Sequence, residues 1–211
     1  MMIIEALLAN AAILLGLALI LWVLAPQADD VSFVDAFWGG GIALLAVLSW
    51  LRLAEAGPLA TMLMAMVVVW GVRLALQRLL RWRREGADPR YARLLAPDRA
   101  RGRFALAALF KVFLLQALLM FVIASPAQYG ILEASWDQAI SGMALLGLAL
   151  FVAGIGCEWF GERRSDRLGL TGTACVWWGI WIAAASAGWW VAAWTAIGPI
   201  VVTVLRFRNR G

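Results

Sequence analysis

The chain has 211 residues, of which 64% are hydrophobic, and it carries a formal net charge of +5. Such a hydrophobic share exceeds what a soluble domain of this length can bury in one core, so an ordinary soluble protein is excluded. The chain contains no histidine, and its two cysteines, Cys157 and Cys175, lack metal-site or CxxC spacing. Histidine-based catalytic triads, proton relays and zinc sites are therefore excluded, and no metal site is expected.

Long apolar runs predict an all-α, polytopic membrane bundle that forms one integral membrane domain over residues 1–211. A membrane-spanning helix needs about 20 apolar residues. Five long spans are expected near residues 6–25, 33–53, 58–80, 104–124 and 138–160. The last apolar stretch, residues 174–207, is interrupted at residues 187–188 and 198–199. It predicts two shorter spans, which gives about seven in all.

Basic residues indicate how the spans are oriented. Nine arginines lie between Arg78 and Arg103, so residues 78–103 are predicted to form a basic cytoplasmic loop with a turn at residues 88–91. Residues 163–167 and 206–210 are also rich in arginine. Because lysine and arginine mark cytoplasmic loops, seven spans place all three segments in the cytoplasm and the N-terminus outside. Polybasic segments beside a membrane ordinarily meet anionic lipid, so membrane lipids, and no nucleic acid, are expected as partners.

Small residues and tryptophans suggest how the helices pack. Gly39 lies in a run of three glycines within the second span, and Gly179, Ala183 and Ala187 recur every four residues. Both patterns favour close helix contact. The tryptophans near the C-terminal end favour an aromatic belt at headgroup depth, with an aromatic-lined ligand pocket as the alternative. These are Trp177, Trp178, Trp181, Trp189, Trp190 and Trp194.

Two charged residues within the spans point to a partner, a cavity or water, because charge at membrane depth is costly. Asp35 lies at the start of the second span, and Arg73 lies in the cytoplasmic half of the third. The two side chains can pair. For Arg73 two further interpretations stay open: its guanidinium reaches the interface along its own stem, or it binds an anion.

Three carboxylates at the end of the fifth span share one helix face. Glu158, Glu162 and Asp166 are spaced by four residues. Like charges at this spacing destabilise an isolated helix by a few tenths of a kcal/mol, roughly, so a helix selected only for stability would avoid them. The pattern indicates either a cytoplasmic charge network with the neighbouring arginines or a ligand site.

A series of motifs spans most of the chain in a characteristic order. They are Asp35 with Phe37, Trp38 and Gly39; Trp70, Gly71, Val72, Arg73 and Leu74; Asp88, Pro89, Arg90 and Tyr91; residues 110–116; Ser125 and Pro126; Glu162 with Asp166; Trp177, Trp178 and Gly179; Gly198 and Pro199. In this order the chain resembles bacterial steroid 5-alpha-reductase-like membrane proteins. The resemblance implies a helical enzyme of the bacterial inner membrane. In such an enzyme, NADPH enters from the cytoplasmic side and reduces a carbon double bond conjugated to a carbonyl in a lipophilic substrate.

The resemblance also assigns candidate site residues. In that family a Glu or Asn, followed four residues later by Asp, helps to hold the cofactor, which implies this role for Glu162 and Asp166. Carboxylates can accept hydrogen bonds from ribose hydroxyls or an amide, and nearby arginines would neutralise phosphates. The expected site residues are Tyr91 as a candidate proton donor and, for the cofactor, Arg73, Asp88, Arg90, Glu162, Arg163, Asp166 and Arg167.

The chain departs from the family pattern in two segments that contribute to the cofactor site. An Arg, His, Pro, Asn, Tyr, Phe, Gly-like motif is expected before the sixth span, but Asp166 is followed almost directly by the next apolar stretch. A basic and aromatic tail is expected where the sequence stops at Gly211. Two alternatives therefore stay open for the reductase-like chain: an active enzyme, or one that is shortened or catalytically inactive.

Two other classes of function stay open beside the reductase. One is a noncatalytic lipid-binding or scaffold protein built on the same helices. The other is a small transporter, for which broken helices and midplane charges are expected, whereas the charges here cluster at one interface. Methyltransferases of the isoprenylcysteine type, which use S-adenosylmethionine, share the distant architecture, but the motifs between Trp70 and Tyr91 fit the reductase-like group better.

Overall fold

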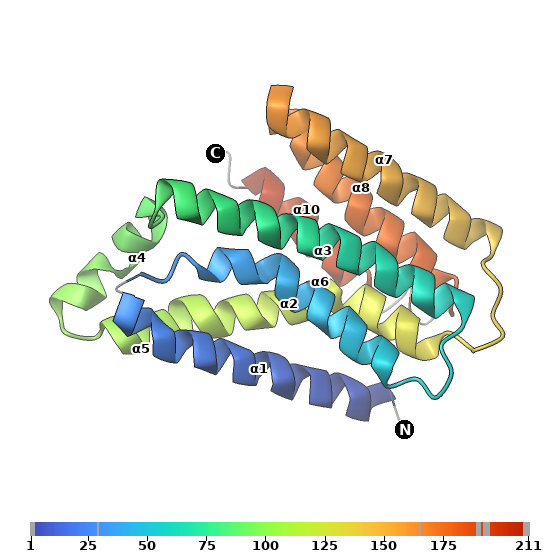
Figure 1. Ribbon diagram of the computed structural model, residues 1–211, viewed down its shortest axis with the longest axis horizontal. Helices are drawn as coiled ribbons and strands as arrows, with labels where there is room; N and C mark the ends of the chain where they lie inside the picture. Colours follow the sequence, from blue (N-terminus) through green and yellow to red (C-terminus); the bar gives the residue numbers. More distant parts are fainter. Residues whose placement is uncertain (1–2, 29, 165, 189–190, 192–194, 209–211) are drawn as a thin grey trace.

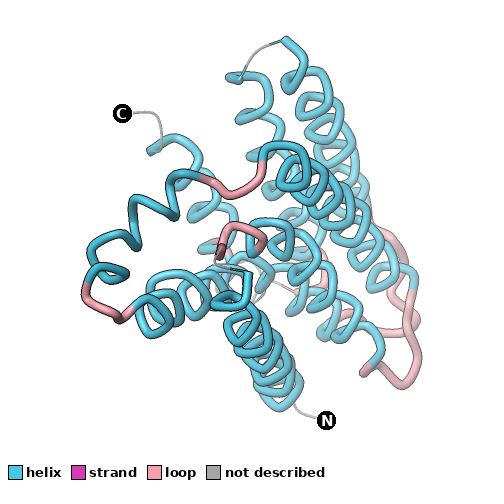
Figure 2. The backbone as a smooth tube through the Cα atoms, turned by 60° about the vertical axis from the view of Figure 1, so that its left-hand side comes forward, coloured by secondary structure: helices cyan, strands magenta, loops and turns pink. Residues whose placement is uncertain are grey.

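The computed structural model describes residues 3–28, 30–164, 166–188, 191 and 195–208, with the side chains of residues 28, 162–168 and 205–208 outside that description. Every regular element in this part of the chain is a helix (Figures 1 and 2). The helices are α1 (Ile3–Ala28), α2 (Val34–Leu51), α3 (Pro58–Glu85), α4 (Pro89–Ala100), α5 (Phe104–Ala108), the π-helix η1 (Leu109–Leu114), α6 (Leu115–Glu133), α7 (Gly142–Arg164), α8 (Asp166–Ala185) and α10 (Ile197–Arg208).

Five helical stretches are long and apolar enough to cross a membrane: α1, α2, α3, the continuous stretch Phe104–Glu133 and α7. The helices α8 and α10 are shorter in their apolar parts. Successive long helices run up and down the long axis of the molecule, with α4 and α5 at one end (Figure 1). The predicted polytopic helical bundle, with five long spans and shorter helices at its C-terminal end, is thereby confirmed.

Residues 78–103, predicted to be a basic cytoplasmic loop, are mostly helical, and the side of the membrane that they face stays a prediction. The helix α3 continues to Glu85 and ends at Gly86, whose φ of 74° is a conformation that suits glycine. Asp88 then caps α4 by accepting a hydrogen bond from the backbone N–H of Arg90 at 2.8 Å, and Pro89 is the first helical residue. Arginine is a good helix former, so a dense arginine segment need not be a loop.

Three other predicted boundaries have mixed outcomes. The interruption at residues 187–188 is confirmed, since α8 ends at Ala185. The interruption at residues 198–199 is wrong, because both residues lie in the first turn of α10. Proline is tolerated there because the first N–H groups of a helix have no intrahelical partner. The helix α6 also continues past Pro126 to Glu133, beyond the predicted end of the fourth span.

Glycines bring two pairs of helices into close contact. A Cβ atom on Gly39 of α2 would collide with the backbone carbonyl of Gly71 of α3. A Cβ on Gly147 of α7 would lie 2.6 Å from the backbone of Gly179 and Ala183 of α8. Both predicted contact faces are therefore confirmed for these residues, and such small residues let helices approach closely in a membrane.

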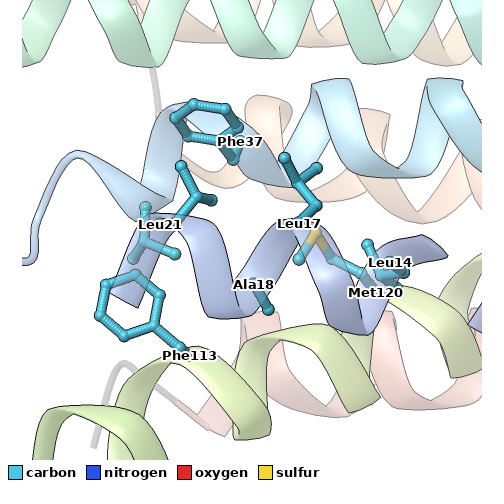
Figure 3. Close-up of a pocket in the computed structure, with 8 residues that line it drawn as sticks. Leu14, Leu17, Ala18, Leu21, Phe37, Phe113 and Met120 are labelled. Atoms are coloured by element: carbon cyan, nitrogen blue, oxygen red, sulfur yellow. The ribbon is translucent and has the colours of Figure 1, made fainter. Parts of the chain in front are cut away.

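The buried interior is mainly apolar, and one of the polar clusters within it lies at the end away from α4. There the Asn10 side-chain amide donates to Ser49 Oγ at 2.9 Å and to Gln128 Oε1 at 3.0 Å, which links α1, α2 and α6. A small gap of about 10 Å³ between the same three helices and η1 is lined only by apolar side chains (Figure 3). It has room for at most one water and offers that water no polar partner, so it is a packing defect.

Candidate functional site

A large cavity lies at the arginine-rich end of the bundle, between α2, α3, α4, α6, α8 and α10. Its volume is about 990 Å³, which is at the upper end of the range of about 300 to 1,000 Å³ for small-molecule sites. The deep wall is apolar and the wall near α4 is polar. The deep wall includes Trp70, Leu74, Ile123, Trp177 and Val202, and the polar wall includes Asp35, Arg78, Asp88, Arg90, Tyr91 and Gln116.

The helix α3 contributes a single face to this cavity. Trp70, Leu74, Arg78 and Trp82 all line it and follow one another at intervals of four residues. Side chains at this spacing stand one above another on a helix. This face of α3 is therefore apolar at its deep end and positively charged nearer to α4.

Tyr91 lies on the inner side of α4. It is half-buried, and Leu95, one turn later, is fully buried in an apolar cluster with η1 and the start of α2. The Tyr91 hydroxyl donates to Asp35 Oδ1 at 2.6 Å. Burial, together with the neighbouring charge of Asp35, raises the pKa of the Tyr91 phenol. This residue is therefore a neutral hydrogen-bond donor throughout the physiological pH range.

Gln116 holds the same hydroxyl from the other side. Its side-chain N–H donates to the Tyr91 oxygen at 3.3 Å, while its carbonyl oxygen accepts from the indole N–H of Trp38. The π-helix η1 ends two residues before Gln116 and adds a residue to one turn. This wider turn changes the register, so Val112 and Phe113 pack into the apolar cluster while Gln116 lines the cavity.

Asp88 and Arg90 form the rim of the cavity at the start of α4. The Arg90 guanidinium donates to Asp88 Oδ2 at 2.7 Å and lies 3.6 Å from Asp35 Oδ2. The hydrogen bond from the Arg90 side chain, with a smaller contribution from its backbone N–H, lowers the pKa of Asp88 below its ordinary value. The rim is thus a compact set of paired charges that also caps α4.

Arg73 pairs with Glu158 of α7, so the expected pairing with Asp35 is wrong. The same carboxylate accepts from the Trp70 indole N–H at 3.4 Å and from the Thr173 hydroxyl. Its side chain is 8% exposed and that of Arg73 is 17% exposed. Neither Arg73 nor Glu158 lines the cavity. The pair lies behind the cavity wall, and it connects α3 to the α7 and α8 pair.

Trp177 also belongs to the wall, so the predicted aromatic belt is wrong for this residue. It is fully buried, and its ring meets that of Trp70 edge to face at a centroid distance of 5.0 Å. This arrangement is favourable between aromatic rings beyond the area they bury. Trp189, Trp190 and Trp194 lie outside the described residues.

A comparison with known protein families gives a match to DUF1295, described as a protein of unknown function, over residues 21–167. The chain belongs to the DUF1295 family. The matched range holds Asp35, Arg78, Tyr91 and Gln116, whereas Thr173, Trp177 and Val202 of the cavity wall lie beyond it. Comparisons with curated proteins and with solved structures gave no match.

In this DUF1295 protein the structure brings together only part of the site expected from sequence. Tyr91, Asp88 and Arg90 line one cavity, whereas Arg73 lies behind its wall. The side chains of Glu162, Arg163, Asp166 and Arg167 lie outside the described part of the chain, so their expected roles stay predictions.

Sequence reasoning missed two polar residues of the DUF1295 cavity. Gln116 belongs to a motif quoted above but was given no role, and no residue pattern signals the π-helix that orients it. Arg78 was counted only as one of nine arginines. Its signal was available, because it continues the spacing of four residues that begins at Trp70 and Leu74.

Proposed function

We propose that this DUF1295 protein is a membrane reductase that uses NADPH to reduce a carbon double bond conjugated to a carbonyl in a lipophilic substrate. One observation carries the proposal: a neutral, half-buried phenol, Tyr91, shares a cavity with a wall of tryptophan and aliphatic side chains. The sequence resemblance to steroid 5-alpha-reductase-like proteins supports it independently.

The residues of the cavity fit NADPH. Arg78, Arg81 and Arg90 line it, and guanidinium groups match the geometry of phosphate oxygens. The carboxylates of Asp35 and Asp88 lie beside them and can accept hydrogen bonds from ribose hydroxyls or a carboxamide. When bound, NADPH supplies the hydride for the reduction.

The chain itself has to stabilise the negative charge that develops on the carbonyl oxygen and has to provide one proton. A preorganised donor at that oxygen is the usual device. The Tyr91 O–H is held between Asp35 and Gln116, so a substrate carbonyl entering the cavity competes with Asp35 for this hydrogen. The deep apolar wall binds the rest of the substrate and excludes water from it.

The membrane setting is part of the same proposal. The arginine-rich end of the bundle faces the cytoplasm of a bacterial cell by the positive-inside rule, and the N-terminus lies outside. The polar rim of the cavity then opens towards the aqueous compartment that holds NADPH. The lipophilic substrate and membrane lipids meet the protein from the bilayer side.

The test compares three proteins purified in a nonionic detergent: wild type, Tyr91→Phe and the control Tyr129→Phe. Tyr129 lies in α6, away from the cavity. NADPH, with NADH as a control ligand, should raise the melting temperature of all three, because ligands stabilise the folded state by mass action. Enone lipids should oxidise NADPH with wild type and Tyr129→Phe, whereas Tyr91→Phe should be slower by about 10²-fold to 10⁴-fold.

A folded wild-type protein that neither responds to NADPH nor oxidises it would refute the reductase proposal. In that case a melting-temperature shift with the enone lipids alone would favour the second candidate, a noncatalytic lipid-binding protein. The observation behind this second candidate is the deep apolar wall, which suits a lipid without any cofactor.

A further inference from the structure

Arg78 differs from the other two arginines that line the cavity. Arg81 pairs with Glu85 at 2.7 Å, and Arg90 pairs with Asp88 at 2.7 Å. Among the side chains that the structure describes, no carboxylate lies within ion-pairing distance of Arg78. Arg78 is nevertheless half-buried in the cavity wall. The cavity therefore holds a positive charge that the described side chains leave unbalanced.

Such a charge is a binding site for an anion. A partly desolvated guanidinium is costly without a counter-charge, and its planar set of N–H donors fits phosphate oxygens in pairs. The nearby carboxylates do not fill this role, because Glu85, Asp88 and Asp35 make their contacts with Arg81, Arg90 and Tyr91.

The neighbours of Arg78 on α3 define what the anionic group is attached to. Leu74 and Trp70 lie one and two helical turns deeper on the same face, which places them about 6 and 12 Å along the helix axis. Beyond them the wall continues with Ile123 and Trp177. We propose that Arg78 binds the phosphate group of a ligand that extends from it into the apolar part of the cavity.

Two sources can supply this phosphate: NADPH or the head of a single-chain lipid phosphate. The inference rests on the proposed function only in that both use the same cavity, and it requires no hydride transfer. The lipid places its chain along Leu74 and Trp70, so it uses both the cationic and the apolar part of the α3 face.

The experiment measures the affinity of purified protein for NADPH, dodecyl phosphate and dodecanol by quenching of tryptophan fluorescence. The variants are Arg78→Gln and Arg78→Lys, with Arg83→Gln as the control, because Arg83 is exposed on the same helix and does not line the cavity. A charged hydrogen-bonded contact is worth roughly 1.5 to 3 kcal/mol. Of NADPH and dodecyl phosphate, whichever binds to the wild-type protein should bind to Arg78→Gln about 10-fold to 100-fold more weakly. Arg78→Lys should fall between, and Arg83→Gln and dodecanol binding should be unchanged.

The outcomes separate this inference from the proposed function. Binding of dodecyl phosphate that depends on Arg78, without any binding of NADPH, supports the inference and removes the reductase. NADPH binding and turnover that are equal in wild type and Arg78→Gln support the reductase and overturn the inference. An equal loss in Arg83→Gln, or no phosphate binding by folded wild type, also overturns it.

Discussion

Replacing Glu158 with alanine should destabilise the protein by about 3 kcal/mol, although Glu158 does not line the cavity. Its carboxylate is the meeting point of Arg73, Trp70 and Thr173, and its side chain is only 8% exposed. Alanine would remove the acceptor that these three donors share inside the bundle. The substitution should therefore weaken the packing of α7 and α8 against α3.

The ion pair dominates the magnitude. The Thr173 hydroxyl also donates to the backbone carbonyl of Gly169 at 3.1 Å, and the Trp70 contact is long at 3.4 Å, so neither loses much. Breaking a buried ion pair by removing one partner costs about 3 to 5 kcal/mol. Arg73 is 17% exposed, which places the expected loss near the lower limit.

The assay is unfolding by sodium dodecyl sulfate in mixed micelles, followed by circular dichroism. Glu85→Ala is the matched control, because its pair with Arg81 is 61% and 63% exposed. An exposed pair one helical turn apart contributes only about 0.3 to 0.5 kcal/mol. The double variant Arg73→Leu, Glu158→Leu should be less destabilised than the sum of the single variants, since both charges leave the interior together.

Unfolding of Glu158→Ala at the same detergent fraction as Glu85→Ala would refute a stabilising role for the buried pair. That result would mean that the Arg73 guanidinium reaches water along its own side chain. The ion pair would then add little to the free energy of unfolding. Strict additivity in the double variant would lead to the same conclusion.

Two further predictions concern a helix contact and a helix cap. Gly154→Ala should cost about 1 to 3 kcal/mol in the same titration, because the new Cβ would lie 2.6 Å from the backbone nitrogen of Val176. Gly156→Ala, which meets nothing within 4 Å, should cost none, and equal costs would contradict the packing argument. Asp88→Ala should speed amide exchange in α4, since a lost cap costs about 1 kcal/mol. Because its pKa is lowered in the fold, ionised Asp88 stabilises α4 fully above about pH 4 and loses this effect as the pH falls through the lowered pKa. Protection of α4 that is the same in both proteins from pH 6 to pH 3 would exclude this role.

The number and order of the long helices followed from the sequence because a run of about 20 apolar residues has few alternatives. The helical state of residues 89–100 was also signalled, since Asp88 and Pro89 are a regular helix start, but the arginines were interpreted as a loop. The partner of Arg73 was not accessible in this way. Glu158 reaches it only because α7 and α8 pack against α3, and this depends on contacts between residues far apart in sequence.

The same limit applies to the site. Tyr91, Asp88 and Arg90 could be predicted as site residues from a sequence motif, because a phenol, a carboxylate and a guanidinium can donate or accept hydrogen bonds in any fold. The role of Arg78 depends on which face of α3 turns inwards, and that of Gln116 depends on a change of helical register at η1. Both are properties of the assembled bundle.

The cavity wall also divides along the chain. Asp35, Tyr91 and Gln116 lie within the DUF1295 match, as do Trp70, Leu74 and Ile123 of the deep wall. Thr173, Trp177 and Val202 of the wall come after it. The polar group around Tyr91 therefore comes from one stretch of sequence, whereas the apolar wall is completed by the helices that follow it. Exchanging the last helices between homologous chains would change one part of the apolar wall while leaving Asp35, Tyr91 and Gln116 in place.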